Sequence, residues 1–566
     1  MALSPTGYVD HFARESLPPQ DQWPTFEFTL PELQYPDRLN AAAELIDAGV
    51  TRFGSDKVAL RVPGGDAWTY GELQHRANQV AQVLTEDFGL QPGNRVLLRS
   101  PNNPWTVACW LGVLKAGGII VTTMVAWQER EVRAVIEKVH PSVALIDHRA
   151  LDGVEHLFGG IPIAVIEGAE APSPSATSVT SATSATDTDR ALIAACDQKS
   201  GEFTAVVTAA DDVALLGATS GTTGVPKVTM HFHRDILANA DTFGSHILGL
   251  TPDDVSAGTA PLAFTFGLGG LVVFPLRSGG SAVLVEKANP VQLAELITEY
   301  GITVFYTAPT GYRAILKQGH AEALSKLRVA VSAGEHLPKE TFAAVEEATG
   351  VRLVNGIGPT EMLHVFISAA GDEIRPGATG RAIPGYRATI LDDNGEEVPA
   401  GQPGRLAVIG PTGCRYLSDE RQANYVANGW NVTGDTYVMD DDGYFFFQSR
   451  TDNLIVASGY NVSATEVEEV IVSHPDVVEC AVIGRPDPEK GTIVNAWVVL
   501  REGVDPGSPT AESIQAHVKA HLAIYKCPRC IDVVSELPRN PSGKVQHFIL
   551  RERAAAEAKA EAQHPA

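Results

Sequence analysis

The chain of 566 residues contains 43 lysines and arginines against 68 aspartates and glutamates, which gives a formal net charge of −25. This balance disfavours nucleic acid as a partner, and any site for an anionic ligand must be locally basic. The length exceeds what one hydrophobic core usually supports, so more than one domain is expected. The first residues, Met1–Pro5, lack a basic segment followed by an apolar one, so we expect no secretory signal and a cytoplasmic protein.

From about residue 55 to 420, short β-branched runs alternate with amphipathic stretches, as at 96–98, 119–121 and 304–306. This alternation predicts an α/β fold with parallel sheets covered by helices. The most apolar long window, 105–124, is interrupted by Lys115 and by two glycines. It therefore predicts a buried helix and strand, with no membrane span and no membrane partner.

Residues 171–189 form a run of Pro, Ser, Ala and Thr with almost no large apolar side chain. Such a segment buries too little surface to order itself, so we predict a mobile surface insertion without a catalytic role.

A glycine- and hydroxyl-rich loop follows. It comprises Thr219, Ser220, Gly221, Thr222, Thr223, Gly224, Val225, Pro226 and Lys227. Glycine lets backbone N–H groups approach anionic oxygens, the hydroxyls add donors, and the lysine adds a positive charge. A Walker loop is excluded, because Lys227 is preceded by Val-Pro and followed by Val228. The loop predicts a triphosphate site.

The pattern changes near residues 450–453, which predicts a boundary between an N-terminal domain of residues 1–451 and a C-terminal domain of residues 452–566. Ser463–Glu466 has the form of a capping box and predicts a helix through Val470, followed by strands at 479–483 and 494–500. About 115 residues suffice for a small α+β domain.

Six cysteines in so long a chain fit reduced thiols better than a disulfide framework. Cys527 and Cys530 form a CxxC pair, but the sequence has no second CxxC and no redox-type context. We interpret both as buried or half-buried structural thiols.

Three strings resemble the adenylate-forming superfamily, which includes acyl-CoA synthetases, aryl-acid activating domains and luciferases. They are 219–227, 261–270 (PLAFTFGLGG) and 356–364 (GIGPTEMLH), and the likeness continues to a lysine in 541–544. The chain looks most like the benzoate- and 2-aminobenzoate-CoA ligases. The resemblance implies a large N-terminal adenylation domain of stacked α/β subdomains, a small mobile C-terminal α+β domain, and the use of ATP, Mg²⁺ and coenzyme A.

By this resemblance, the loop 219–227 wraps the β- and γ-phosphates, Thr360 approaches the α-phosphate, and Glu361 approaches Mg²⁺. A hard oxygen ligand such as Glu361 also suits Mg²⁺ on its own chemistry. Asp435 resembles the ribose ligand of the family, although Gly-Asp alone is ordinary turn chemistry. Arg450 is a candidate cation for the phosphates.

Most adenylating enzymes have a tyrosine that stacks on adenine at the position of Ile357. An aliphatic residue can offer only apolar packing, so we expect adenine specificity to depend on backbone contacts near Gly334 and Glu335 and near Asn355 and Gly356.

Three residues of the C-terminal region have roles implied by the resemblance. Lys544 bridges the attacking carboxylate and the phosphate, although a lone lysine after a turn is usually exposed. Asp452 resembles the hinge about which the C-terminal domain rotates, and rotation brings the segment around Gly459 toward the active site to make room for the pantetheine arm.

Phe264, Phe266 and His364 are the side chains that we place around the acid, with Gly267, Ala333 and Gly358 beside them. On pattern alone, two phenylalanines at i and i+2 could equally lie on one face of a core strand, and a lone histidine among apolar residues is usually a core residue. The resemblance favours an aromatic-lined slot for a short aromatic acid: 2-aminobenzoate, salicylate or benzoate.

The sequence thus predicts an ATP-dependent, AMP-forming aryl-CoA ligase. One alternative is an aryl-acid adenylating enzyme that loads a carrier protein. A catalytically inactive binding protein is disfavoured because Lys227, Glu361, Asp435, Arg450 and Lys544 occur together, and the aryl-pocket string argues against an oxygenase of the luciferase type. The oligomeric state is open between a monomer and a homodimer.

Overall fold

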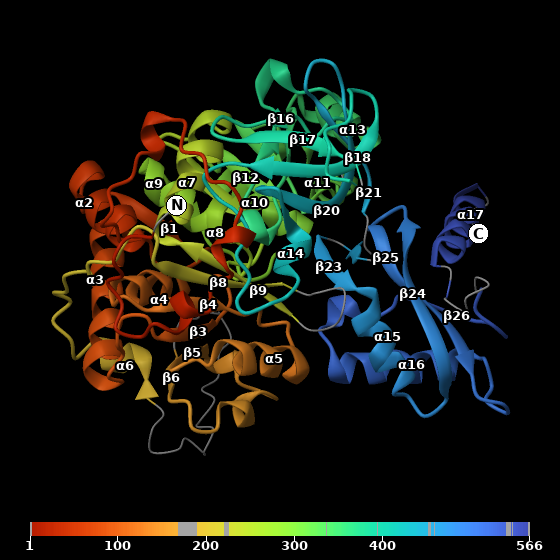
Figure 1. Cartoon of the computed structure of the whole chain (residues 1–566), viewed down its shortest axis with the longest axis horizontal. Coiled ribbons are helices and arrows are strands. Elements are labelled where there is room, and N and C mark those ends of the chain that lie inside the picture. The colour runs from red at the N-terminus through yellow and green to blue at the C-terminus, as the bar shows by residue number, and fades with distance from the viewer. Residues whose placement is uncertain are drawn as a thin grey trace.

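The computed structural model describes residues 3–167, 190–219, 226–334, 337–392, 394–450, 454–457, 459–538, 545 and 547–563. The predicted insertion 171–189 lies outside these residues. Within them, two large sheets and a smaller antiparallel sheet lie in the N-terminal part, and a separate C-terminal unit follows (Figure 1). No helix in the described ranges is long and apolar enough to cross a membrane.

The first sheet has seven strands among the described residues, in the order β7-β6-β5-β3-β4-β8-β9. All neighbours are parallel except β8 and β9. Their bounds are β3 Arg95–Arg99, β4 Ile119–Thr122, β5 Val143–Asp147, β6 Ile163–Ile166, β7 Arg190–Ala191, β8 Val213–Thr219 and β9 Lys227–Phe232.

The second sheet has nine strands among the described residues, in the order β16-β15-β14-β13-β12-β10-β11-β1-β2. The six strands from β14 to β1 in this order are parallel, and the outer strands are antiparallel. The bounds are β1 Val58–Arg61, β2 Trp68–Thr69, β10 Val255–Gly258, β11 Ser281–Val283, β12 Val304–Thr307, β13 Val329–Ser332, β14 Leu353–Ile357, β15 Ile367–Ser368 and β16 Arg381–Ala382.

Helices cover both sheets, as the alternating pattern predicts. Helix α4, Pro104–Lys115, is buried at every residue, and β4 follows it directly. The apolar window 105–124 is therefore a buried helix and strand, as predicted. The other helices of this part are α1 Phe12–Glu15, α2 Ala48–Phe53, α3 Tyr70–Gln82, α5 Glu129–Val139, α6 Leu192–Cys196, α7 His233–Asn239, α8 Thr265–Leu268, α9 Phe274–Ser278, α10 Pro290–Glu299, α11 Pro309–Lys317, α12 Ala321–Leu324, α13 Lys339–Thr349 and α14 Gln422–Tyr425.

An antiparallel sheet precedes the C-terminal unit. Its strands are β17 Arg387–Leu391, β18 Pro403–Ile409, β19 Val426–Ala427, β20 Trp430–Met439 and β21 Phe445–Arg450.

The C-terminal unit has its own apolar core, to which α15, β24, β25 and α16 contribute. Its elements are the hairpin β22 Leu454–Ala457 and β23 Tyr460–Ser463, helix α15 Ala464–Val472, the sheet β24 Val477–Asp487, β25 Gly491–Leu500 and β26 Cys530–Val533, and helices α16 Ser508–His521 and α17 His547–Gln563. The predicted helix and both predicted strands are present. The boundary at 451/452 stays a prediction, because residues 451–453 lie outside the described ranges.

The predicted capping box at the start of α15 is only half correct. The Ser463 side chain accepts a hydrogen bond from the Glu466 backbone N–H, as a cap should. The Glu466 carboxylate instead binds Lys526. A buried cation is a stronger partner for a carboxylate than a backbone N–H, so the carboxylate turns away from the cap.

Candidate functional site

The carboxyl ends of parallel strands in the second sheet gather the predicted acid-binding residues. The loop 259–264 follows β10, Ala333 follows β13, and Gly358 follows β14. In register, β12 lies between β10 and β13, and β14 lies beside β13. Ligands of open α/β sheets bind outside such strand ends, because the connecting loops meet there.

The predicted phosphate loop connects the antiparallel strands β8 and β9. Thr219 and Lys227 face each other across the antiparallel pair, so the backbone fixes both ends of the loop. Ser220, Gly221, Thr222, Thr223 and Gly224 lie outside the described residues.

Lys227 and Glu361 meet at one tyrosine, Tyr416. The Lys227 ammonium lies 5.3 Å from the centre of the Tyr416 ring, and the Tyr416 hydroxyl donates a hydrogen bond of 2.5 Å to Glu361 Oε1. Glu361 is only 8% exposed. Burial and the neighbouring carboxylate raise the pKa of Tyr416 well above its usual value, so its hydroxyl stays a donor. The structure thus joins the end of the phosphate loop to the predicted magnesium ligand.

The first sheet also holds Thr360 in place. Buried His231 on β9 contacts the Thr360 carbonyl oxygen through Nε2 at 2.8 Å, and Thr229 contacts the same nitrogen at 3.0 Å. Gly217 on β8 allows this approach, since a Cβ there would lie 2.9 Å from Thr360 Cγ2. The turn that contains Thr360 and Glu361 is therefore anchored beside the phosphate loop.

The described residues among those predicted to bind the nucleoside lie on or just after strands of the second sheet and of the antiparallel sheet. Asn355, Gly356 and Ile357 are on β14, and Asn355 pairs with Ser332 on β13. Asp435 is buried on β20, opposite Arg450 on β21. Gly334 has a φ of +86°, a conformation that favours glycine. Glu335 lies outside the described residues.

His364 stands in an aromatic cluster. Its ring centre is 4.6 Å from that of Phe274, 5.4 Å from Phe243 and 5.8 Å from Phe266. Burial lowers the pKa of His364 to about 3, so the ring is neutral. Backbone crowding requires the two neighbouring glycines: a Cβ at Gly358 would lie 2.1 Å from the His364 carbonyl oxygen, and one at Gly267 would lie 2.2 Å from that of Pro261.

Phe264 and Phe266 do not lie on a core strand, so that interpretation of their spacing is wrong. Phe264 caps the short helix α8, which begins at Thr265. The helical turn sends the two rings in different directions: Phe266 contacts His364, whereas Phe264 lies 5.9 Å from Tyr460 of the C-terminal unit. Of these two phenylalanines, only Phe266 belongs to the cluster around His364.

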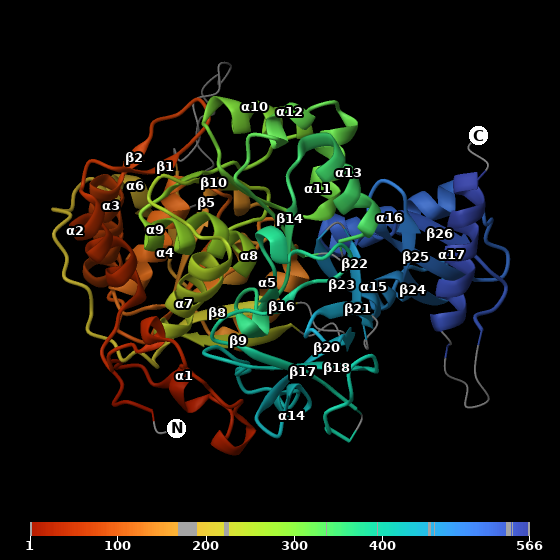
Figure 2. The ribbon, with the colours of Figure 1, turned by 90° about the horizontal axis from the view of Figure 1, so that it is seen from above.

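The C-terminal unit contacts the N-terminal site through Gly459 and Tyr460. A Cβ at Gly334 would lie 3.8 Å from the Gly459 Cα, so these two glycines are adjacent. Helix α17 packs on β24 at the far side of the C-terminal unit in both views (Figures 1 and 2). Lys544 and Asp452 lie outside the described residues.

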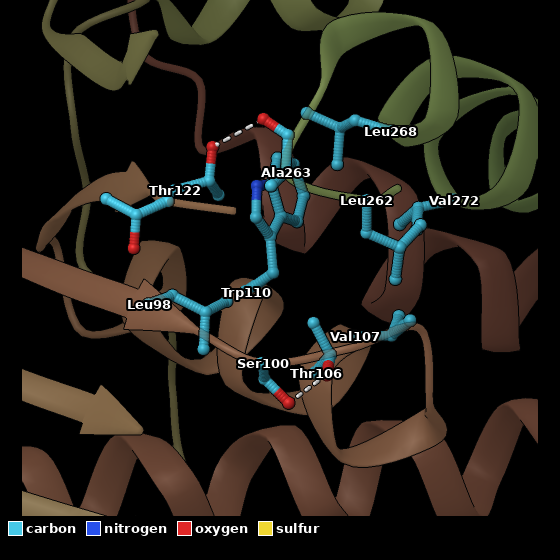
Figure 3. A pocket seen from close by; sticks show the side chains of 11 residues that line it. Leu98, Ser100, Thr106, Val107, Trp110, Thr122, Leu262, Ala263, Leu268 and Val272 are labelled. Carbon is cyan, nitrogen blue, oxygen red and sulfur yellow. Dashed lines mark hydrogen bonds between the residues drawn. The ribbon is translucent and has the colours of Figure 1, made fainter. Parts of the chain in front are cut away.

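Two cavities share Leu268, the last residue of α8, in their lining. The first has about 290 Å³ of empty space, open solvent at its mouth included, and Trp110, Thr123 and Leu262 are among its lining. Figure 3 shows its side chains, with a hydrogen bond from Thr122 to the Ala263 carbonyl. The second has about 230 Å³ on the same measure and lies against His364 and Asn239. Leu268 lines both cavities and separates them.

Cys527 is buried, Cys530 is half-buried, and both are free thiols. In the described part of the chain, no group of three or more His, Cys, Asp or Glu residues could hold a metal ion.

Three buried histidines predict acid sensitivity of the fold. Burial lowers the pKa of His231 and His364 to about 3 and that of His233 to about 4. The unfolded chain binds these protons near pH 6.5, so the free energy of unfolding should decrease as pH falls from about 6.5 toward 4, by about 1.4 kcal/mol per pH unit for each histidine.

Urea denaturation between pH 7.5 and 4.5 measures this slope. His233→Gln should reduce it by about a third, whereas the exposed His521→Gln should leave it unchanged. A free energy of unfolding that stays constant down to pH 5 would contradict the prediction.

Sequence comparison assigns the chain to a family. Residues 46–416 match the AMP-binding enzyme family, and residues 466–544 match the AMP-binding enzyme C-terminal domain. The chain belongs to this family, the adenylate-forming acyl-CoA synthetase superfamily, and the predicted fold class is confirmed. The prediction of an AMP-forming acid–thiol ligase is confirmed at the level of the family, because the relatives with curated names include benzoate– and 3-hydroxybenzoate–CoA ligases.

Particular relatives share nearly the full length. The chain is 32% identical to a benzoate–CoA ligase of Thauera aromatica, over 92% of this chain and 98% of that protein. It is 32% identical to the anthranilate CoA ligase AuaEII, solved with anthranoyl-AMP, over 94% of this chain and all of that one, with a TM-score of 0.69. The amide bond synthetase McbA of Marinactinospora thermotolerans is 27% identical over 91% of this chain and all of its own, with a TM-score of 0.79.

Tyr416 and His231 contact the site, but no sequence motif pointed to them. Tyr416 lies 55 positions from Glu361, and no local motif marks it. The nearest signal for His231 is its position in the strand that follows the phosphate loop. Only the folded chain shows these contacts.

Proposed function

We propose that this protein is an ATP-dependent aryl-CoA ligase. It converts a small aromatic acid to its CoA thioester through an acyl-adenylate and releases AMP and pyrophosphate. The main support is the joining of Lys227 and Glu361 through Tyr416, beside the aromatic cluster around His364.

The first half-reaction needs positioning and charge neutralisation more than a protein nucleophile. A carboxylate oxygen of the acid attacks the α-phosphorus of ATP, and the bond to the β-phosphate oxygen breaks to release pyrophosphate. Lys227 and the loop 219–224 would hold the β- and γ-phosphates, and Thr360 would lie near the α-phosphate. The anchoring of the Thr360 carbonyl by His231 supports this placement, because it fixes the turn next to the loop.

Asp435 would accept hydrogen bonds from the ribose hydroxyls, and Arg450 would add a cation nearby. Ile357 would pack on the adenine, with backbone contacts from Gly334, Glu335, Asn355 and Gly356. Their positions on β14, on β20 and β21 and after β13 support this arrangement.

Glu361 fits Mg²⁺ as a single hard oxygen ligand. It is buried next to the lysine that ends the phosphate loop, and Tyr416 engages its Oε1. Mg²⁺ commonly binds one or two carboxylates together with substrate phosphates, which agrees with the absence of a larger ligand cluster among the described residues. When bound, the ion would neutralise phosphate charge.

In the second half-reaction, the CoA thiol loses its proton, its sulfur attacks the acyl carbonyl, and AMP leaves. Rotation of the C-terminal domain about Asp452 would withdraw Lys544 from the active site and bring the segment around Gly459 into it. The contacts of Gly459 with Gly334 and of Tyr460 with Phe264 support the thioester-forming arrangement for the structure described here.

The acid would lie against Phe266, His364 and the backbone of Gly267, Ala333 and Gly358. An aromatic-lined site of this kind suits benzoate, 2-aminobenzoate or salicylate. The names of the benzoate–CoA and anthranilate–CoA ligases support this substrate class.

The test is acid-dependent AMP formation with ATP, Mg²⁺ and CoA, over benzoate and its amino- and hydroxy-substituted relatives, with the thioester identified by mass. We expect AMP and aryl-CoA in equal amounts. Adenylate that accumulates with CoA but is consumed by a holo carrier protein would favour the carrier-loading alternative. Transfer to an added amine in preference to CoA would favour amide synthesis, and no acid-dependent AMP or pyrophosphate would refute the proposal.

A further inference from the structure

The cavity behind His364 contains a buried hydrogen-bond acceptor without a partner. Asn239, at the end of α7, is 2% exposed. Its side-chain nitrogen donates to the Asp235 carbonyl at 2.7 Å, which fixes the orientation of the amide. Its Oδ1 is then directed elsewhere, and it has no hydrogen-bond partner among the described residues. A buried acceptor left unpaired costs free energy, so such groups in native proteins usually have a ligand or water partner.

The same cavity contains a second polar group with spare hydrogen-bonding capacity. His364 is 3% exposed, and neither of its ring nitrogens makes a well-formed hydrogen bond within the described ranges. The Phe266 backbone contacts the ring, and this contact acts to raise the pKa of His364 against the larger effect of burial. Because the ring is neutral, it offers one donor and one acceptor.

The position of the cavity links it to the acid. Thr265 and Leu268 of α8, together with Gly269 directly after it, form one wall, and Ile236 and Asn239 of α7 form another. Each wall continues into a π-helical turn, at 240–247 and at 269–273. Such turns are rare and frequently occur at functional sites. The remaining lining is apolar, with room for about one water-sized group.

We propose that Asn239 determines substrate specificity: its Oδ1 accepts a hydrogen bond from a hydroxyl or amino group on the aromatic ring of the acid, within the cavity shared with His364. The inference rests on the proposed function and narrows its substrate class from benzoates in general to those with a hydrogen-bond donor on the ring. A methyl group, which is similar in size to a hydroxyl or amino group, would fill the space but leave Oδ1 unpaired. A site that hydrogen-bonds a substrate hydroxyl or amino group rejects an analogue that lacks this group.

The first experiment needs only the unaltered protein. It compares kcat/KM for hydroxy- and aminobenzoates with the matching methylbenzoates at the 2-, 3- and 4-positions. We expect one hydroxy or amino isomer to exceed its methyl counterpart by about 10- to 100-fold. Equal values, or a preference for methyl at every position, would overturn the inference whether or not any variant folds.

The second experiment uses Asn239→Leu, which keeps the number and branching of the side-chain heavy atoms and removes the acceptor. The ratio of kcat/KM for the preferred acid to kcat/KM for its methyl counterpart should fall to near one. Both acids are measured on the same variant, so any general loss of activity cancels in this ratio. Trp110→Phe is the matched control. It removes another buried group without a partner in the described residues, the indole Nε1, from the cavity on the other side of Leu268 (Figure 3).

The preference for the hydroxy or amino acid over its methyl counterpart should be unchanged in Trp110→Phe. A ratio that persists in Asn239→Leu, or that is lost only in Trp110→Phe, would show that the substituent does not bind Asn239. In either case acids are still activated, so the proposed ligase function stands. If no acid supports AMP formation in the unaltered protein, the ligase proposal fails and this inference fails with it.

Discussion

Lys544→Ala is expected to abolish adenylate formation but to leave thioester formation from a supplied acyl-adenylate largely intact. The lysine would bridge the acid carboxylate and the α-phosphate, where negative charge builds up in the first transition state. Removing one such group commonly costs about 10²- to 10³-fold in rate. The second half-reaction expels AMP from a formed adenylate and has no need of that bridge.

The arrangement of the C-terminal unit supports this division. Gly459 lies at Gly334, whereas α17, which begins at His547, lies on the far side of the unit in both views (Figures 1 and 2). Acid-dependent pyrophosphate release measures the first step, and aryl-CoA formation from synthetic adenylate measures the second. The exposed Lys519→Ala is the control and should change neither. An equal loss of both steps in Lys544→Ala would refute the division of roles.

Lys526→Met is expected to impair mainly the thioester-forming step, by at least about tenfold. Lys526 is 1% exposed and binds two buried carboxylates: Glu466 of the same unit, at 2.9 and 3.0 Å, and Glu131 of the N-terminal region. Burial alone would lower the pKa of Lys526, but Tyr525 and the two carboxylates outweigh it and raise this pKa. The lysine therefore stays charged.

The cluster fixes how the two regions dock. Without the lysine, two buried carboxylates would face each other uncompensated, and breaking a buried pair commonly costs about 3–5 kcal/mol. Aromatic contacts join the same interface: Trp127 donates to the Tyr525 hydroxyl at 3.0 Å, and Tyr525 stacks on Tyr460. The cost therefore falls on the arrangement that places Gly459 and Tyr460 at the active site.

The two half-reaction assays test this prediction with Lys526→Arg, which retains the charge, as the matched control. Adenylate formation should stay within about threefold in both variants, since it requires the other arrangement. Because Lys526 also binds Glu466 within its own unit, thermal unfolding should be recorded in parallel. Unchanged thioester formation in Lys526→Met, or a parallel loss of both steps, would contradict a role for this cluster in docking.

The sequence by itself determined the features that depend on local pattern. The buried helix and strand at 105–124, the Ser463 cap and the strands around 479–483 and 494–500 follow from hydrophobic periodicity and capping chemistry over a few residues. The phosphate loop was recognisable for the same reason, because its glycines, hydroxyls and lysine are contiguous.

The tertiary structure decided which distant groups meet. Spacing alone left Phe264 and Phe266 open to a strand, but the backbone turns into α8 at Thr265 and separates their rings. The pairing of Glu466 with Lys526 replaced half of a capping box, because a charged partner 60 positions away outcompetes a nearby backbone N–H. Tyr416 and Asn239 belong to no motif and reach Glu361 and the His364 cavity only through packing between elements that are far apart in the chain. Such contacts depend on how sheets and helices pack in three dimensions, which no local sequence pattern encodes.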